Sequence, residues 1–258
     1  MKRALKAEFR KLRFQRSTYG ILATATAISV VSAISIVAAA QMPRSGMFMD
    51  LTSQTTMRTV MGSAASGYLF ALILGIVMST TEYRHSTAVA TYLAQPRRTT
   101  VMYAKMVAAA VAGFVLQLIS TAVAMVAGLM YAGRYPHFTL PMSDYTSIMA
   151  GALLTGVVLA IMGVAVGMLI RSQMVAVVLA MLWLQLIEGL LLVFADWLGK
   201  WSITGAINSV LQVAVETPEV SMTSSDLLTP WQSVFLLLAY GALFAAVAVR
   251  TTMRRDVD

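Results

Sequence analysis

Long runs of apolar residues alternate with short polar stretches along the whole chain. At about 20 residues per crossing, this pattern predicts six membrane-spanning helices, at residues 20–40, 60–79, 102–131, 148–170, 174–195 and 231–250. The third run is longer than a bilayer needs, so we expect this helix to tilt or to project beyond the membrane. The connecting segments are too short to form separate domains. The pattern thus predicts an all-α polytopic membrane protein with one transmembrane domain over residues 1–258.

A further amphipathic segment precedes the first span. Within residues 4–16, Leu5, Phe9 and Leu12 share one helical face, and Lys and Arg residues occupy the other faces. Phe14 lies off this apolar stripe. A helix of this kind is typical of the membrane interface, with its basic face toward lipid phosphates. A disordered basic tail over residues 1–19 is the alternative.

The first span shares two features with a cleaved signal peptide. Basic residues precede it, and the three alanines at 38–40 resemble a cleavage site. The apolar core of a signal peptide is about 7–15 residues long, whereas residues 20–40 form a longer uncharged run. We therefore expect this segment to be retained as a membrane span.

The loop between the second and third spans, residues 80–98, has signals of a short helix. Ser79-Thr80-Thr81-Glu82 has the form of a capping box, and Pro96 ends a helix because its ring clashes with the preceding turn. The residues that would share one face of this helix are Glu82, His85, Ser86, Val89 and Leu93. The sequence therefore predicts a helix of about three turns at the membrane surface. A solvated loop that happens to be helical is the alternative.

Another short apolar segment lies at residues 203–215, within the stretch 196–230 that follows the fifth span. It is too short to cross a bilayer and carries Thr204, Asn208 and Gln212. These features are typical of an interfacial or re-entrant helix. An amphipathic helix outside the membrane fits the same residues.

Composition supports the membrane assignment and the charge distribution predicts an orientation. Hydrophobic residues make up 59% of the chain and charged residues 12%, against about 25% charged residues in soluble domains. With both termini in the cytoplasm, 15 of the 19 Lys and Arg residues lie on the cytoplasmic side, as the positive-inside rule requires. This topology accounts for the net charge of +8 without nucleic-acid binding. With no cysteine, disulfides, thiolate metal ligands and cysteine nucleophiles are excluded.

Two charged residues fall inside the predicted spans, Lys105 near the start of the third and Glu188 in the fifth. A charged residue at this depth is expected to face protein or a water-filled cavity. Gln185 precedes Glu188 by about one helical turn. Two interpretations of Glu188 remain open. It makes a structural hydrogen bond near Gln185 or to a neighbouring span, or it lines a translocation path.

Several kinds of activity are not favoured. His85 and His137 lie on opposite sides of the membrane in this topology, and the spans contain one acidic residue, so a membrane-embedded enzyme or a metal site is not indicated. The 19 methionines are scattered, as expected of packing residues. An ion-coupled secondary transporter acting through Glu188 would show an internal repeat, and none is evident. This transporter class and a non-catalytic membrane scaffold remain as alternatives.

Small residues recur at helix-packing spacing in two spans. Gly163 and Gly167 form a G-x-x-x-G motif in the fourth span, and Ala71 and Gly75 have the same spacing in the second. Such motifs let helices approach closely. We interpret both as packing within the chain rather than as a contact between two copies.

The segments AEFRKLRFQRSTYGIL and ILGIVMSTTEYRHSTAVATYLAQPRRTTVMYAKMVA, together with six spans in 258 residues, resemble the permease subunits of type-2 ABC exporters, which fold like the G-subfamily exporters. The E-Y-R-H-x-T segment followed by P-R-R is the most specific part of this resemblance. In that family, the helix between spans two and three is a coupling helix that docks on the ATPase subunit. The residues that correspond to it by position are Glu82, Tyr83, Arg84, His85 and Thr87.

The resemblance also implies partners. The chain lacks a G-x-x-x-x-G-K-[ST] phosphate-binding loop, so we expect that it cannot hydrolyse ATP alone. No cofactor is expected in this chain, and a separate ATPase chain would bind ATP and Mg. Two copies of this permease, or one copy and a close paralogue, would assemble with two ATPase copies in a bacterial plasma membrane. The short external loops and apolar spans favour a lipophilic drug, a peptide antibiotic or a lipid as the exported substrate. Glu188 and Gln185 are the candidate path residues.

Overall fold

The structure, a computed structural model, describes most of the chain. The described residues are 2–39, 54–84, 98–133, 140–170, 172–190, 196–213, 215–217, 220–222 and 228–254. Most of the loop expected to hold the coupling helix, residues 85–97 with His85 and Thr87, lies outside them. So do His137 and the end of the predicted fifth span.

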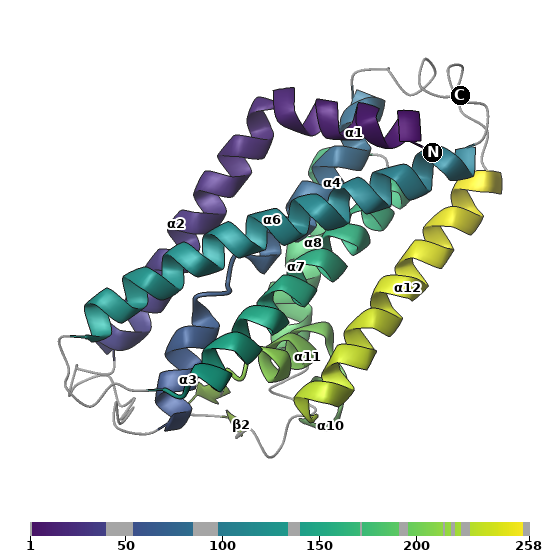
Figure 1. The fold of residues 1–258 in the computed structure, drawn as a ribbon. Coiled ribbons are helices and arrows are strands. Elements are labelled where there is room, and N and C mark those ends of the chain that lie inside the picture. The colour runs from purple at the N-terminus through teal and green to yellow at the C-terminus, as the bar shows by residue number, and fades with distance from the viewer. Residues whose placement is uncertain are drawn as a thin grey trace.

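Six helices within the described residues are long and apolar enough to cross a membrane, which confirms the predicted all-α fold with six spans. Four of the spans are single helices: α2 (Arg16–Ala39), α6 (Arg98–Ala132), α7 (Met142–Ile170) and α12 (Pro230–Arg254). The second span consists of α3 (Gln54–Ser63) and α4 (Tyr68–Arg84), and the fifth consists of α8 (Gln173–Met181) and its continuation to Leu190. Helix α6 has 35 residues, which makes it about 50 Å long. It runs obliquely across the bundle (Figure 1), as expected for a helix longer than the bilayer is thick.

The N-terminal segment forms a helix, α1 (Lys2–Phe14), that lies across one end of the bundle (Figure 1). Its apolar face packs on the protein, because Leu12 is buried and Leu5 and Phe9 join the same core cluster as Met102 and Met106 of α6. The basic residues of α1 are exposed to different extents, and Phe14 is exposed. The predicted helix is therefore confirmed.

Helices α4 and α7 form the closest contact in the bundle. A Cβ atom on Gly75 would lie 2.1 Å from the carbonyl oxygen of Ala160, and one on Gly163 would lie 2.1 Å from that of Leu72. A Cβ atom cannot lie so close to a carbonyl oxygen, so the two backbones can approach this closely only because both positions are glycine. The small-residue motifs of the second and fourth spans therefore pack against each other within the chain, as the sequence indicated.

The second span is interrupted, which the sequence did not indicate. A turn at residues 64–67 separates α3 from α4, and Gln117 of α6 donates a 2.7 Å hydrogen bond from Nε2 to the carbonyl oxygen of Ala65. The hydroxyl oxygens of Ser29 and Ser120 lie within 3.0 Å of the point where a Cβ on Gly67 would sit. Buried polar side chains of α2 and α6 thus surround the irregular backbone, as such a break inside a bilayer requires.

The predicted capping box at residues 79–82 is wrong. These residues lie inside α4, which continues to Arg84, and the hydroxyl groups of Ser79, Thr80 and Thr81 bond to carbonyl oxygens three or four residues earlier. This back-bonding is compatible with a continuing helix. Glu82 has a partner elsewhere, described below, so it does not turn back to a helix start.

The fifth span changes helical type along its length. Helix α8 continues into a π-helical segment, η1 (Leu182–Ile187). The short helices α10 (Asp196–Gly199) and α11 (Ile203–Val210) follow, with a hairpin of β1 (Val215–Thr217) and β2 (Val220–Met222) paired antiparallel.

Helix α11 is shorter than the predicted 203–215, because the chain turns at Gln212 with a φ of 56°. Its buried Ile203 and Ile207 belong to the same apolar cluster as Leu159 of α7 and Leu237 of α12. The segment is therefore packed into the core of the bundle.

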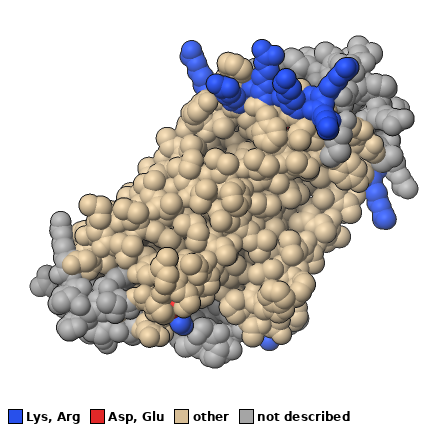
Figure 2. Space-filling model, viewed as in Figure 1, with Lys and Arg blue, Asp and Glu red and all other residues tan. Residues whose placement is uncertain are grey.

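The start of α1 and the end of α12 lie at the same end of the bundle, together with the end of α4 and the start of α6 (Figure 1). Figure 2 shows that Lys and Arg side chains gather at this end on the face in view. We call it the basic end. The opposite end carries α10, the lower part of α3 and the β-hairpin.

Candidate functional site

Four charged side chains from three helices meet at the basic end, and we call them the charge cluster: Glu8 and Lys11 of α1, Glu82 of α4 and Lys105 of α6. Lys105 Nζ lies 3.0 Å from Glu82 Oε1 and 3.4 Å from Glu8 Oε2. Lys11 Nζ lies 2.8 Å from Glu8 Oε1 and also pairs with Glu82 Oε1. The cluster therefore connects α1, α4 and α6 through two lysines that share two carboxylates.

Burial makes this arrangement unusual. Lys105, Glu8 and Glu82 are 2%, 4% and 7% exposed, and Lys105 also donates a hydrogen bond to the carbonyl oxygen of Met78 at 3.2 Å. Charges removed from water are strongly destabilising unless they are paired and hydrogen-bonded. Two acids and two bases balance here, so the cluster carries no net charge. Removal of one member would leave a net charge in this buried cluster.

Lys11 is the member of the cluster that reaches water, since its side chain is 44% exposed. Burial alone would lower its pKa, but the hydrogen bonds and the negative charges of Glu8 and Glu82 outweigh burial and raise the pKa above its usual value. A raised lysine pKa stabilises the fold at all pH values below the unfolded value of about 10.4. This contribution is lost only as the pH rises through the raised pKa, so Lys11 stays charged at neutral pH.

The sequence identified two members of the cluster, Glu82 and Lys105, but not that they pair. It missed Glu8 and Lys11 altogether. One signal was available, because Glu8 lies three residues after Leu5 and four before Leu12, on the apolar face of α1. An acid on that face needs a cation, and Lys105 at the start of the third span needs an acid.

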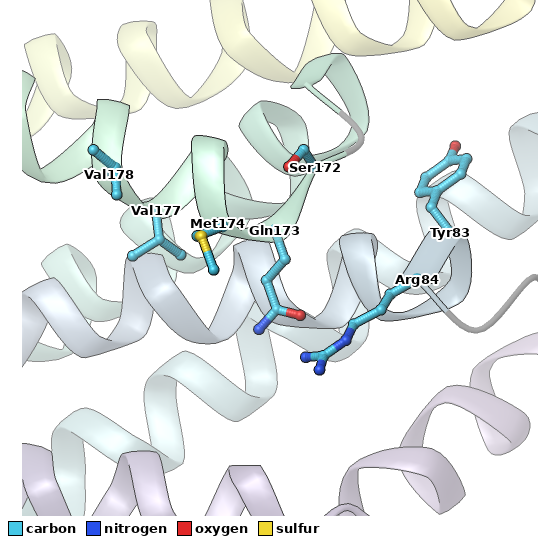
Figure 3. Close-up of a pocket in the computed structure, with 7 residues that line it drawn as sticks. All are labelled: Tyr83, Arg84, Ser172, Gln173, Met174, Val177 and Val178. Atoms are coloured by element: carbon cyan, nitrogen blue, oxygen red, sulfur yellow. The ribbon is translucent and has the colours of Figure 1, made fainter.

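The next residues of the predicted coupling segment lie at the end of α4. Tyr83 is half-buried and Arg84 is exposed. Both line a cavity of about 620 Å³ with residues from the start of α8, namely Ser172, Gln173, Met174, Val177 and Val178 (Figure 3). The role of these residues in coupling remains a prediction.

Glu188 is a second buried acid, 2% exposed, on the helical continuation of η1. Its Oε1 accepts a hydrogen bond from Trp183 Nε1 at 3.0 Å, and its Oε2 accepts one from the backbone N–H of Thr204 at 2.6 Å. Thr204 lies in the first turn of α11, where the N–H groups have no partner within the helix. The carboxylate therefore fixes the start of α11 to the fifth span, aided by the favourable interaction of a negative charge with a helix N-terminus.

Gln185 and Glu188 do not form one site. Glu188 is buried toward α11, whereas Gln185 is exposed on the outer surface of η1. The structural interpretation of Glu188 has a specific partner in α11, which the sequence did not identify. A role for either residue in a translocation path remains a prediction. Within the described residues, no three side chains of His, Asp or Glu lie close enough together to hold a metal ion.

The six apolar helices, with charged side chains gathered at one end, define a multi-pass helical membrane protein. The family model described as ABC-2 family transporter protein matches residues 4–186. The match covers more than half of the chain, so this protein belongs to the ABC-2 transporter family and is a transmembrane subunit of an ABC transporter. This confirms the resemblance found in the sequence. A comparison with individual curated proteins found no match.

Proposed function

We propose that the chain is the permease of an ATP-driven exporter and that a separate ATPase subunit binds at the basic end. Membership of the ABC-2 family supports a permease role. The missing phosphate-binding loop supports a separate ATPase chain. Because the basic end carries the excess of Lys and Arg, we assign it to the cytoplasm of a bacterial cell, with both termini on that side. The substrate class that fits the apolar spans is a lipophilic drug, a peptide antibiotic or a lipid.

The charge cluster is the observation that carries this proposal. Residues 85–97 connect α4 to α6, and the cluster joins the two helices close to this connection, through Glu82 in the last turn of α4 and Lys105 about two turns into α6. It also attaches α1 to both helices. A force applied to residues 85–97 by a motor subunit would therefore move α1, α4 and α6 as a unit. Buried, hydrogen-bonded ion pairs suit this task because they are rigid and specific in geometry.

This geometry refines the role of Glu82. Its carboxylate is bound to Lys11 and Lys105 within the chain, so we assign it to positioning rather than to direct contact with the ATPase. Tyr83, Arg84, His85 and Thr87 remain the candidate docking residues. Glu188 accepts one hydrogen bond from Trp183 of its own span and one from the start of α11. No observation favours an ion-coupled secondary transporter.

A charge-balanced double variant tests the proposal. Glu82→Met with Lys105→Met removes one acid and one base and leaves the Glu8–Lys11 pair. Replacing a buried ion pair by well-packed hydrophobic side chains of similar volume is often neutral in stability, whereas removing one partner costs about 3–5 kcal/mol. We therefore expect the double variant to fold and to bind the ATPase. Its ATP-driven export in proteoliposomes should fall by about two- to thirtyfold, the range that corresponds to lost coupling energies of 0.5–2 kcal/mol.

Arg10→Gln, at an exposed position of α1 outside the cluster, is the matched control and should export normally. The purified chain alone should not hydrolyse ATP. Wild-type export by a correctly assembled double variant would contradict a role of the cluster in coupling. ATP hydrolysis by the isolated chain would contradict the proposed division between permease and motor.

A further inference from the structure

The cavity between the end of α4 and the start of α8 combines two kinds of surface. Arg84 provides a guanidinium group, and in Figure 3 its side chain and that of Gln173 extend toward the same side. Met174, Val177 and Val178 provide the apolar surface, at positions i, i+3 and i+4 on one face of α8. A polar mouth and an apolar wall within one cavity suit an amphiphilic ligand.

The mouth carries one positive charge and two uncharged polar side chains. Arg84 is exposed and makes no ion pair with any residue that the structure describes. Ser172 precedes α8, and its side chain makes no hydrogen bond to that helix. The guanidinium fork matches the oxygen atoms of a phosphate group. Gln173 adds an amide that can donate to the same group.

The position of the cavity indicates where such a ligand would come from. Arg84 is the last residue of α4, at the basic end, where the positive charges of α1 also gather (Figure 2). The apolar wall belongs to a helix long and apolar enough to cross the membrane, and Met174 and Val178 are exposed on it. The mouth therefore lies at the level of lipid headgroups, while the wall extends toward the level of the acyl chains.

We propose that this cavity binds an anionic phospholipid from the surrounding leaflet. The phosphate lies against Arg84, with Gln173 and Ser172 as hydrogen-bond partners, and one acyl chain lies along Met174, Val177 and Val178. A soluble anion would leave the apolar wall uncovered, and an uncharged lipid would leave the positive charge uncompensated. The ligand is neither the exported substrate nor the ATPase, so the site goes beyond the proposed function, and it assigns Arg84 to lipid binding rather than to ATPase docking.

Lipid titration of the purified chain, without an ATPase, tests the site. Native mass spectrometry compares phosphatidylglycerol with phosphatidylcholine of the same acyl chains. We expect a preference for phosphatidylglycerol that Arg84→Gln weakens by about fivefold, the value for one basic residue near an anionic headgroup. Arg10→Gln removes an exposed arginine of α1 outside the cavity and should leave the preference unchanged. Equal effects of the two variants would overturn the proposal, because they would indicate a general surface charge.

A second pair of measurements tests the acyl-chain contact. Met174 is 80% exposed, so Met174→Gln should fold normally and should weaken phosphatidylglycerol binding. Glycerol phosphate, which has the headgroup charge but no acyl chains, should not compete at the concentrations at which the lipid binds. Effective competition by glycerol phosphate would overturn the lipid assignment and identify an anion site. Unchanged lipid binding by Met174→Gln would overturn the proposed acyl-chain position.

Discussion

Glu188 illustrates how one polar side chain organises a membrane-embedded region. It is buried, and both of its carboxylate oxygens accept hydrogen bonds, one from the indole of Trp183 and one from the first turn of α11. An acid in an apolar span is tolerated when such partners replace water. The residue that the sequence singled out as a path candidate thus has a structural task, which is to fix α11 to the fifth span.

Substitution Glu188→Gln should therefore lower stability. The amide retains the shape but removes the negative charge at the α11 N-terminus. Its NH2 group also faces an N–H donor, at a position where a carboxylate oxygen accepted a hydrogen bond. Hydrogen bonds to charged groups contribute about 1.5–3 kcal/mol, so we expect a loss of this size, measured as a lower thermal unfolding temperature in detergent. Gln185→Ala, at the exposed neighbour, is the control and should unfold like the wild type. Unchanged stability with lost export would instead favour a path role for the charge.

Among the helices, α4 and α7 are the pair whose packing leaves least tolerance. Gly75 and Gly163 each bring their own backbone against a carbonyl group of the partner helix. The break between α3 and α4 occurs beside this tightly packed unit, and Gln117 of α6 binds the carbonyl oxygen of Ala65 there. The second span thus consists of α4, which is held firmly by α7, and α3, which is attached to α4 through a turn.

Gly75→Ala should consequently destabilise the fold. Its Cβ would lie 2.1 Å from the carbonyl oxygen of Ala160 and 2.8 Å from the backbone nitrogen of Val164, and backbone atoms cannot rotate away. Overpacking of this kind costs about 1–3 kcal/mol, detectable by thermal unfolding. Gly20→Ala makes the same chemical change in α2, where nothing lies within 4 Å of the new Cβ, and should be neutral or slightly stabilising. Equal unfolding temperatures for both variants would contradict the close approach of α4 and α7.

For the whole molecule, one outer face combines apolar residues with a polar side chain. On η1 the side chains of Leu182 and Leu186 are exposed, as is that of Gln185. A polar amide within a span is expected to face protein or a water-filled space rather than lipid. We expect the second permease copy that the family resemblance implies to contact the exposed surface of η1.

Cross-linking tests this arrangement directly because the chain contains no cysteine. Gln185→Cys should form covalent dimers in native membranes when treated with a short bifunctional thiol reagent. Val31→Cys, on the exposed face of α2 and 62% exposed, should not. Cross-linking at position 31 but not at 185, in complexes that contain two copies, would place the contact on another face.

The six spans, the amphipathic helix at the N-terminus and the intramembrane charges could be read from the sequence. Each of these features depends on residues close together in the chain. Hydrophobicity summed over about 20 residues decides whether a helix crosses a membrane, and the spacing of Leu5, Phe9 and Leu12 decides which face of α1 is apolar. The sequence also indicated correctly that Gly75 and Gly163 serve packing within the chain. For Lys105 and Glu188 it showed that a partner is needed, but not which.

The partners were decided by the tertiary structure. Glu8 and Lys105 are 97 residues apart in the chain, and they meet only because α1 folds across the ends of α4 and α6. The misassigned helix start at residues 79–82 has the same cause. Residues 79–82 have the residue types of a capping box, but in the folded chain Glu82 pairs with Lys11 and Lys105, and α4 continues to Arg84. The break at residues 64–67 likewise has its hydrogen-bond partner, Gln117, on another helix. Contacts between distant segments follow from how rigid helices pack, and no local pattern encodes them.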